Sequence, residues 1–297
     1  MMAKTEHTAG ALQPYSIRVI ISPAKKMNAD PDTLPAESLP VFPAETEQII
    51  EYLKSLSYAE ARALWRCNDK LTELNFARVQ EMELHADMKM EEGSRQALSS
   101  LTPALLAYEG IQYRYLAPKT LDEGALSWLS EHLRILSGFY GVLRPFDGVM
   151  PYRLEMQAEA KIGGKRNLYE FWGDKLRRAL GTSPVFILNL ASKEYAKAVE
   201  PHLRYGDRWL SCVFAEQKDG KLVQKATLAK MARGEMTRYL AETLSHRKEL
   251  DGTMQVGELM TAVKNFNRLG FSWSEAHSTE RELVFICGSK TGDHVKN

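Results

Sequence analysis

The sequence predicts an α/β (mixed α+β) fold: a single compact domain with a mixed sheet flanked by helices. Two observations support this fold class. Short β-branched or apolar runs alternate along the chain with longer segments of helical periodicity. The 297-residue chain also has no internal repeat and no long low-complexity linker. We therefore expect one domain over residues 16–290, with a disordered tail at 1–15 and a short tail at 291–297.

The N-terminal part predicts a strand, a loop and a helical region. Ile17–Ser22 is a β-branched run that ends at a proline, which is typical of a buried strand followed by a turn. Asp30–Pro43 holds four prolines, which favour an extended loop. Helical periodicity then extends from Ala44 to about Val79. Within it a capping box marks one helix start, with Ser57 as N-cap, Glu60 as its partner and the helix itself over Tyr58–Trp65.

The C-terminal half predicts a second set of strands and helices. Gly181 follows the helical run Lys165–Leu180, as a C-cap residue does. Asp219-Gly220 is a hairpin signal between two β-prone runs. The elements expected here are the helix at 165–180, strand Val185–Leu190, hairpin strands Arg208–Phe214 and Lys221–Ala226, helix Thr227–Leu244, and two strands within Phe271–Cys287.

Composition predicts a globular protein of the cytoplasm. Hydrophobic residues make up 44% of the chain and charged residues 26%. Apolar runs such as Val185–Leu190 are far shorter than the ~20 residues of a membrane helix, so we expect no membrane partner. Cys67, Cys212 and Cys287 are too widely spaced to predict disulfides or a metal centre. We expect no bound metal and no cofactor, and a monomer is favoured.

Charge is distributed unevenly along the chain. The net charge is −5 over residues 1–124, +7 over 125–240 and −1 over 241–297. A basic middle third between acidic flanks is typical of a groove for a polyanion. The alternative is that charge simply fluctuates along any sequence.

The segment Leu133–Met156 combines glycines, X-Pro steps and arginines within an apolar framework. Each glycine weakens a regular element and each proline removes a backbone donor, so the segment predicts a shaped turn system. Such turns hold arginines in fixed directions. The segment therefore indicates an anion-binding surface, and nucleic acid is the first candidate ligand; its members are Arg134, Gly138, Gly141, Arg144, Gly148 and Arg153.

Two predicted strands end in similar chemistry. Ser22 is followed by Lys25 and Lys26, whereas Ser192 is followed by Lys193 and Lys197. A hydroxyl at the start of a helix caps it, and the free N–H groups there attract anions. In open α/β sheets the carboxyl ends of the strands are the usual ligand crevice. The alternative is an ordinary N-cap with solvated lysines.

The predicted helix Thr227–Leu244 separates apolar from basic residues. A glycine inside a basic stripe permits the close approach of a phosphodiester backbone. We expect Arg233 to face away from the core and Tyr239 to be buried, although a merely solvated face is the alternative. The apolar side is Leu228, Ala232, Met236, Tyr239 and Leu240, and the opposite side is Lys230, Arg233, Gly234 and Thr237, with Arg238 near its edge.

Leu136–Gly141 is similar to the turn of a helix-hairpin-helix element, which presents backbone N–H groups to phosphates. Its two glycines are one residue further apart than in that pattern, and a strand entering a tight turn is the alternative. Common catalytic and nucleotide-binding motifs are absent from the sequence. Catalytic residues therefore stay unassigned, and an enzyme is less expected than a binding protein.

Several motifs together resemble one family, the bacterial peroxide stress protein YaaA family, over about residues 17 to 290. The motifs are ISPAKKM (Ile21–Met27), Asn68–Leu71, LRILSGFYGVLRPFD (Leu133–Asp147), PYRLEM (Pro151–Met156), YEFWGDKL (Tyr169–Leu176), NLASKEYAKAV (Asn189–Val199) and KMARGEMTRYL (Lys230–Leu240). The resemblance implies survival of hydrogen peroxide stress by keeping free iron low, which limits oxidative DNA damage. It also implies DNA binding, a positively charged cleft and a helix-hairpin-helix element in a compact α/β fold.

The leading hypothesis is a DNA-binding stress protein that grips backbone phosphates with low sequence specificity. The second is an enzyme acting on a nucleotide or nucleic acid, using Ser22, Glu155, Ser192 or Tyr195. The third is an iron-sequestering protein, for which ligand-rich spacing is absent. We expect Lys25, Arg144, Arg153, Lys193 and Arg233 to converge on one concave surface. The full candidate set for phosphate binding is Ser22, Lys25, Lys26, Arg134, Gly138, Gly141, Arg144, Arg153, Ser192, Lys193, Lys197, Lys230, Arg233 and Arg238.

Overall fold

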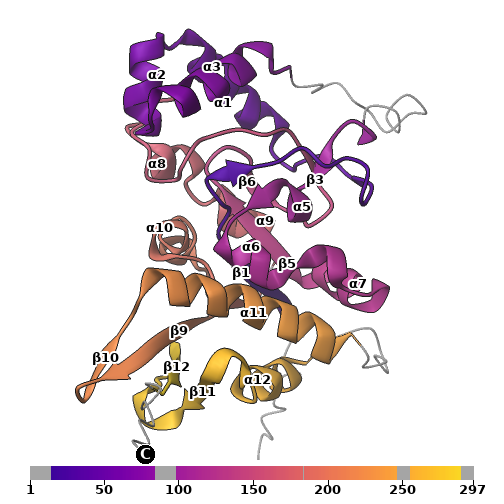
Figure 1. The fold of residues 1–297 in the computed structure, drawn as a ribbon, viewed down its shortest axis with the longest axis vertical. Coiled ribbons are helices and arrows are strands. Elements are labelled where there is room, and N and C mark those ends of the chain that lie inside the picture. Colours follow the sequence, from indigo (N-terminus) through magenta and orange to yellow (C-terminus); the bar gives the residue numbers. More distant parts are fainter. Residues whose placement is uncertain (1–14, 84–97, 183, 246–254, 289–297) are drawn as a thin grey trace, which may run out of the picture.

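The computed structural model describes residues 15–83, 98–182, 184–245 and 255–288. Within them, eight strands form a mostly parallel central sheet in the order β11-β12-β9-β8-β1-β5-β6, with β10 paired to β9 (Figure 1). Neighbours from β12 to β5 are parallel, and β11, β10 and β6 are antiparallel to their partners. The strands are β1 (Ser16–Ile21), β5 (Leu133–Ser137), β6 (Gly141–Leu143), β8 (Val185–Asn189), β9 (Arg208–Lys218), β10 (Lys221–Val223), β11 (Phe271–Ser274) and β12 (Glu282–Cys287).

Strand β1 lies at the centre of the sheet between β8 and β5. It pairs with β8 from Ser16↔Val185 to Ile20↔Asn189, and with β5 from Val19↔Leu133. Val19, Ile20 and Ile21 are fully buried, as expected for a parallel strand covered on both faces. Because β1 and β8 run in the same direction, their carboxyl ends meet at one edge of the sheet.

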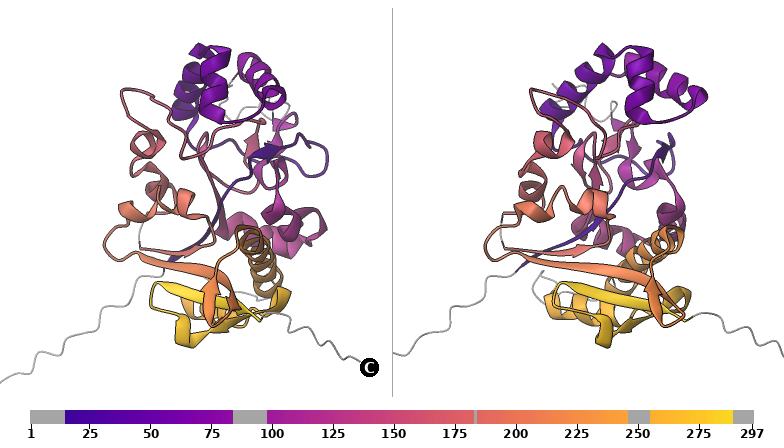
Figure 2. Two further views of the ribbon diagram at one scale, coloured as in Figure 1. Left: turned by 60° about the vertical axis from the view of Figure 1, so that its left-hand side comes forward. Right: turned by 90° about the vertical axis from the view of Figure 1, so that its left-hand side faces the viewer.

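Three helices form one end of the molecule, and β11, β12 and α12 (Val256–Lys264) lie toward the other end (Figures 1 and 2). The three are α1 (Pro43–Ser55), α2 (Tyr58–Trp65) and α3 (Asp69–Glu81). The predicted capping box is confirmed, because the Ser57 side chain accepts a hydrogen bond from Glu60 N and the Glu60 carboxylate accepts one from Ser57 N. The sequence therefore predicted the start of α2 to the residue.

Helices cover both sides of the sheet. In Figure 2, α7 (Glu123–His132) and α11 (Ala226–Leu244) lie on one side of β1, and α9 (Lys175–Ala179) lies on the other. The remaining short elements are β2 (Lys26–Met27), β3 (Thr102–Pro103), α5 (Ala104–Ala107), β4 (Tyr108–Glu109), α6 (Ile111–Leu116), η1 (Pro118–Thr120), β7 (Gly148–Val149), α8 (Leu168–Trp172), α10 (Lys193–Ala196), η2 (Glu200–His202), η3 (Arg268–Gly270) and η4 (Glu275–His277).

The predicted hairpin and the two C-terminal strands are confirmed. Asp219 and Gly220 both have positive φ, as a two-residue turn between β9 and β10 requires. The continuous helix predicted over 165–180 is wrong. It consists of α8 and α9, which are separated at Gly173, whose φ of +49° breaks the helix.

The facing predicted for α11 is right for Ala232, Met236 and Leu240, which are fully buried, but wrong for the opposite side. Thr237 is fully buried, and Gly234 lies so close to α6 that a Cβ there would be 2.0 Å from the Gln112 carbonyl oxygen. The glycine therefore serves helix–helix contact rather than approach to a ligand. Arg233 is mostly buried and Tyr239 is only half-buried, packing edge-on against Phe266. Lys230 is the member of the predicted stripe that is exposed.

Leu136–Gly141 contains no helix, so a helix-hairpin-helix turn is not formed there. The segment is the end of β5, a turn and the start of β6, which was the alternative. Gly141 has a φ of +77° and packs against Trp172, and a Cβ on Gly138 would lie 2.9 Å from the Leu154 carbonyl oxygen. Both glycines are buried, and their small size allows the turn to pack into the core.

The tails predicted at residues 1–15 and 291–297 lie outside the described residues, apart from Tyr15. Among the helices that are described, none combines the length and the hydropathy needed to cross a membrane.

We predict that Gly234→Ala destabilises the protein. The new methyl group clashes with the α6 backbone, and overpacking of this kind costs on the order of 1–3 kcal/mol or more. Gly257→Ala in α12 is the matched control, because a Cβ at that position would have no neighbour within 4 Å and alanine favours helix. Urea unfolding of both variants checks this. Equal midpoints for Gly234→Ala and the parent would contradict the close packing of α6 and α11.

Candidate functional site

A pocket of about 390 Å³ lies at the carboxyl ends of β1 and β8; we call it the carboxyl-end pocket. The loop after β1, residues 152–155, the start of α10, the start of α6 and one side of α11 surround it. The residues that line it are Ser22, Pro23, Ala24, Lys25, Lys26, Glu109, Gly110, Ile111, Gln112, Tyr113, Tyr152, Arg153, Leu154, Glu155, Ser192, Glu194, Tyr195, Lys230 and Arg233.

Ser22 and Ser192 connect the two strand ends. The Ser22 Oγ accepts a hydrogen bond of 2.8 Å from Ser192 N and donates one of 3.2 Å to Ser192 Oγ. The Tyr113 hydroxyl donates to the Ser22 carbonyl oxygen at 3.0 Å, which fixes α6 against the same strand end. Neither serine is hydrogen-bonded to a histidine or a carboxylate among the described residues. Each therefore lacks the adjacent base that activates a serine nucleophile.

Glu155 lies among the cations of the pocket. Lys25 Nζ is 2.8 Å from Glu155 Oε2, and Arg153 Nη2 is 3.6 Å from Glu155 Oε1. The Lys25 side chain is 65% exposed, whereas that of Arg153 is 11% exposed. Lys26 pairs with Glu109 at the mouth of the pocket. Three of the cations around the pocket therefore have carboxylate partners.

Arg233 has a different environment. Its guanidinium forms no ion pair or hydrogen bond with any described residue, and its Nε is buried. Burial lowers the pKa of Arg233, and the nearby Cys212 side chain opposes this shift. A mostly buried guanidinium without a counterion is unfavourable unless an anion reaches it.

Buried tyrosines support one wall of the pocket. Tyr108 and Tyr152 hydroxyls are 2.8 Å apart, and Tyr152 also hydrogen-bonds Ser137 Oγ at 2.7 Å. Burial raises the pKa of Tyr152 to about 12 and those of Tyr108, Tyr113 and Tyr195 well above the usual value. At neutral pH these phenols are protonated. They can donate hydrogen bonds but cannot act as bases.

Glu194 is the second carboxylate beside Glu155. Burial raises its pKa, and the negative charge of Glu155 adds to the effect, while a hydrogen bond from Gln157 N at 3.2 Å opposes it. The pocket therefore contains a carboxyl group that takes up a proton more readily than a solvent-exposed glutamate.

A second pocket, of about 850 Å³, lies on the other side of α10; we call it the α10 pocket. Lys193, Lys197 and Arg281 line it, and Arg233 lines both pockets. Lys197 Nζ lies 5.1 Å from the centre of the Tyr169 ring, and Arg281 pairs with Glu200. Arg233 thus links two neighbouring basic pockets.

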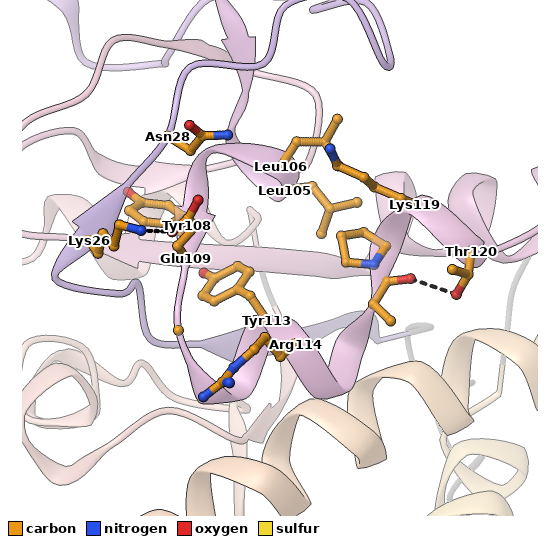
Figure 3. Close-up of a pocket in the computed structure, with 13 residues that line it drawn as sticks. Lys26, Asn28, Leu105, Leu106, Tyr108, Glu109, Tyr113, Arg114, Lys119 and Thr120 are labelled. Carbon is orange, nitrogen blue, oxygen red and sulfur yellow. Dashed lines mark hydrogen bonds and ion pairs between the residues drawn. The ribbon is translucent and has the colours of Figure 1, made fainter.

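A third pocket, of about 620 Å³, adjoins the carboxyl-end pocket and has a largely apolar wall beside α6 (Figure 3). Lys26, Tyr108 and Glu109 lie on one side of it and Lys119 on the other, and the ring of Tyr113 lies between them. We call it the α6 pocket. It shares Lys26, Glu109, Gly110 and Tyr113 with the carboxyl-end pocket.

The structure brings together part of the predicted surface. Lys25, Arg153 and Arg233 line the carboxyl-end pocket, and Lys193 lies next to them in the α10 pocket. Arg144 is elsewhere: its Nε donates to Asp147 at 2.9 Å and its Nη2 to the Leu39 carbonyl oxygen at 3.0 Å. The predicted candidates that line one of the two basic pockets are Ser22, Lys25, Lys26, Arg153, Ser192, Lys193, Lys197, Lys230 and Arg233.

Two further predicted arginines also point elsewhere. Arg134 is near the start of β5, away from the strand carboxyl ends, and donates to the Ser130 and Leu133 carbonyl oxygens. Burial, and then the like charge of Arg18, lowers the pKa of Arg134 to about 10. Arg238 donates to the Leu116 and Ala117 carbonyl oxygens and pairs with Glu242 at 2.8 Å. Both side chains support the packing of neighbouring elements.

A family model described as peroxide stress protein YaaA matches residues 17–276. The chain belongs to this family. The match includes every segment that lines the carboxyl-end pocket. The match to the YaaA family therefore spans both the fold and the residues that line the site.

Relatives of this YaaA family member match along nearly the whole chain. A UPF0246 protein of Lachnoclostridium phytofermentans is 47% identical over 272 residues, which cover 92% of this chain and 97% of the relative. UPF0246 proteins of Lactiplantibacillus plantarum and Pediococcus pentosaceus are each 45% identical, cover 91% of this chain and are themselves covered to 99% and 98%.

Sequence reasoning missed several residues that line the carboxyl-end pocket of this YaaA family member, among them Glu109, Gln112, Tyr113 and Glu194. Gln112 and Tyr113 lie on α6, a short helix that has no local sequence signal and reaches the site only through its packing on α11. Glu194 lies between Lys193 and Tyr195, both of which were candidates from the sequence. Considering the acidic as well as the basic neighbours of Ser192 would therefore have found it. Among the described residues, no group of three or more histidine, cysteine, aspartate or glutamate side chains is placed to hold a metal ion.

We predict that Glu194→Gln raises the free energy of unfolding at neutral pH relative to the parent. The folded pKa lies above the ordinary 4.5, so the folded state binds the proton more tightly and the parent loses stability as pH rises through that window. Glutamine keeps an acceptor for Gln157 N and carries no charge. Melting temperatures at pH below 4.5 and at neutral pH check this, since the variant should gain only at the higher pH. The same difference at both values would contradict it.

Proposed function

We propose that the protein binds DNA, mainly through backbone phosphates, across the carboxyl-end and α10 pockets. The observation that supports this most strongly is Arg233, which lines both pockets and has no protein partner among the described residues. A phosphate oxygen supplies the charged acceptor that this guanidinium lacks. Because DNA carries phosphates in a regular row, neighbouring phosphates reach neighbouring pockets.

The cations around Arg233 favour contact with more than one phosphate. Lys25 and Arg153 come from the β1 and 152–155 segments, Lys230 from α11, and Lys193 and Lys197 from α10. Helix α10 has only four residues, and α11 is packed against α6 and β9, so neither can enter a major groove. The arrangement therefore suits phosphate contacts, which position DNA without reading its bases.

In this proposal, DNA binding serves the peroxide stress response for which the family is named, and it helps limit iron-driven oxidative damage to DNA. A strain lacking the gene tests this when it carries the parent chain, Arg233→Gln or Arg114→Gln. Survival of hydrogen peroxide and the content of oxidised guanine in DNA are measured. If the parent chain and Arg233→Gln protected the strain equally, a role in the stress response would not depend on this DNA-binding surface.

We predict that DNA affinity falls steeply with salt and depends little on sequence. If about four phosphates are contacted, affinity drops on the order of 100-fold between about 50 and 200 mM salt, because bound counterions are released. Fluorescence anisotropy with duplexes of unrelated sequence measures both properties. An affinity that is indifferent to salt, or that follows one base sequence, would remove the proposal.

We also predict that Arg233→Gln weakens DNA binding roughly 10- to 150-fold, since one charge-assisted hydrogen bond is worth roughly 1.5–3 kcal/mol. The slope of log affinity against log salt should fall by about one. Arg114→Gln is the matched control: it removes one exposed arginine of α6 that lies outside both basic pockets. Thermal unfolding of each variant verifies the fold. Equal losses in both variants would mean that overall charge, and not this site, governs binding.

An enzyme acting on a nucleotide or nucleic acid is a second candidate, which the two carboxylates favour. Glu155 and Glu194 face the same pocket as the cations, and its volume is within the range of small-ligand sites. A proton-binding Glu194 is suited to act as a general acid. A turnover screen with nucleotides and oligonucleotides tests this. Activity that Glu194→Gln abolishes while DNA binding persists would favour it over binding alone.

A further inference from the structure

The carboxyl-end pocket is smaller and more enclosed than the two pockets beside it. Its volume of about 390 Å³ suits a ligand of about the size of one nucleotide. A phosphate inside an intact strand continues into sugar on both sides, so it can touch the mouth of such a pocket but cannot enter it fully. A phosphate at the end of a strand, or on a free nucleotide, has only one attached sugar and can enter.

The charges that line the pocket favour a dianion. Five cations and three carboxylates give a net charge of +2. A phosphate monoester carries about −1.5 to −2 at neutral pH, whereas a phosphodiester carries about −1. The monoester therefore neutralises most or all of the excess positive charge of the pocket, whereas the diester leaves about half of that charge. The cations are Lys25, Lys26, Arg153, Lys230 and Arg233, and the carboxylates are Glu109, Glu155 and Glu194.

Hydrogen-bond donors without partners occur on three of these lining residues. Gln112 Nε2, Arg153 Nε and Arg233 Nε are buried and have no hydrogen-bond partner among the described residues, and the Gln112 residue is only 6% exposed. Unpaired buried donors are costly, and because these three atoms are buried, an acceptor reaches them only if the lining of the pocket shifts as the ligand binds. A monoester offers three terminal oxygens for these groups, one more than a diester offers.

We propose that the carboxyl-end pocket binds a terminal phosphate monoester, on a DNA strand end or on a free nucleotide. This inference rests on the proposed phosphate-binding function and makes its ligand specific. The α10 pocket, joined through Arg233, then holds internal phosphates of the same DNA. The two pockets thus contact different phosphates of one molecule.

The test uses the full chain and short duplexes of one sequence with no terminal phosphate, a 5′-phosphate or a 3′-phosphate. Anisotropy measures binding, with the label placed internally. Deoxyadenosine monophosphate and deoxyadenosine serve as competitors, which separates a free nucleotide from a strand end. One phosphorylated end should bind about tenfold more tightly than the bare end, as expected for one further set of charge-assisted contacts. Only the nucleotide, and not the nucleoside, should compete.

Arg233→Gln should lose most of the gain from the terminal phosphate and Lys25→Gln part of it, because Lys25 exchanges its ion pair with Glu155 for the phosphate, whereas Arg114→Gln should keep the gain. Lys25 is exposed, so this variant stays informative if Arg233→Gln fails to fold. Equal affinity for phosphorylated and bare ends in the parent would overturn the inference and leave salt-sensitive DNA binding intact. A gain that survives in both pocket variants would overturn the assigned site. Binding of the nucleotide without any DNA binding would support the inference and overturn the proposed function.

Discussion

The position of the candidate site depends on the parallel pairing of β1 with β8. The paired residues run from Ser16↔Val185 to Ile20↔Asn189. Had the two strands run in opposite directions, Ser22 and Ser192 would lie at opposite edges of the sheet. The hydrogen bond from Ser192 N to Ser22 Oγ closes the junction and fixes where α10 begins. Lys25 and Glu194, each a few residues further on, therefore face one pocket although 169 positions separate them in the chain.

The second constraint is the contact between α6 and α11. Gly234 removes the Cβ that would otherwise separate the two helices, so the Gln112 backbone approaches α11 directly. Arg233, the preceding residue, thereby lines the pocket with its Nε buried. The same contact brings Tyr113 within hydrogen-bond distance of Ser22. The packing of α6 against α11 thus determines where the charged side chain of Arg233 lies in the site.

Local sequence signals predicted the elements whose causes are local. The capping box of α2 and the Asp219-Gly220 hairpin depend on residues within one turn, and both are observed. The prediction of an exposed basic stripe on α11 was wrong because the sequence does not reveal that this helix packs against both α6 and β9. The prediction that Arg134 lines the site was wrong for a related reason. Which end of a strand faces a ligand depends on the topology of the sheet, and this is not visible in the local sequence. Lys25, Arg153 and Arg233 were placed correctly in one pocket, whereas Gln112 depended on a helix pairing that no sequence pattern encodes.

The ion pairs within the pocket determine which cations gain most from a ligand. Lys25 and Arg153 are partly neutralised by Glu155, and Lys26 by Glu109, so a phosphate must compete with a carboxylate for each of them. Such an exchange yields little net energy, because one charge-assisted contact replaces another. Arg233 has no partner to exchange within the described part of the chain, so its contact with a phosphate replaces no ion pair there. The carboxylates also disfavour weakly charged ligands, since only an anion that outcompetes Glu155 offsets the loss of its ion pairs. Selectivity for a strongly charged phosphate thus arises from the acidic residues of the pocket as much as from its basic ones.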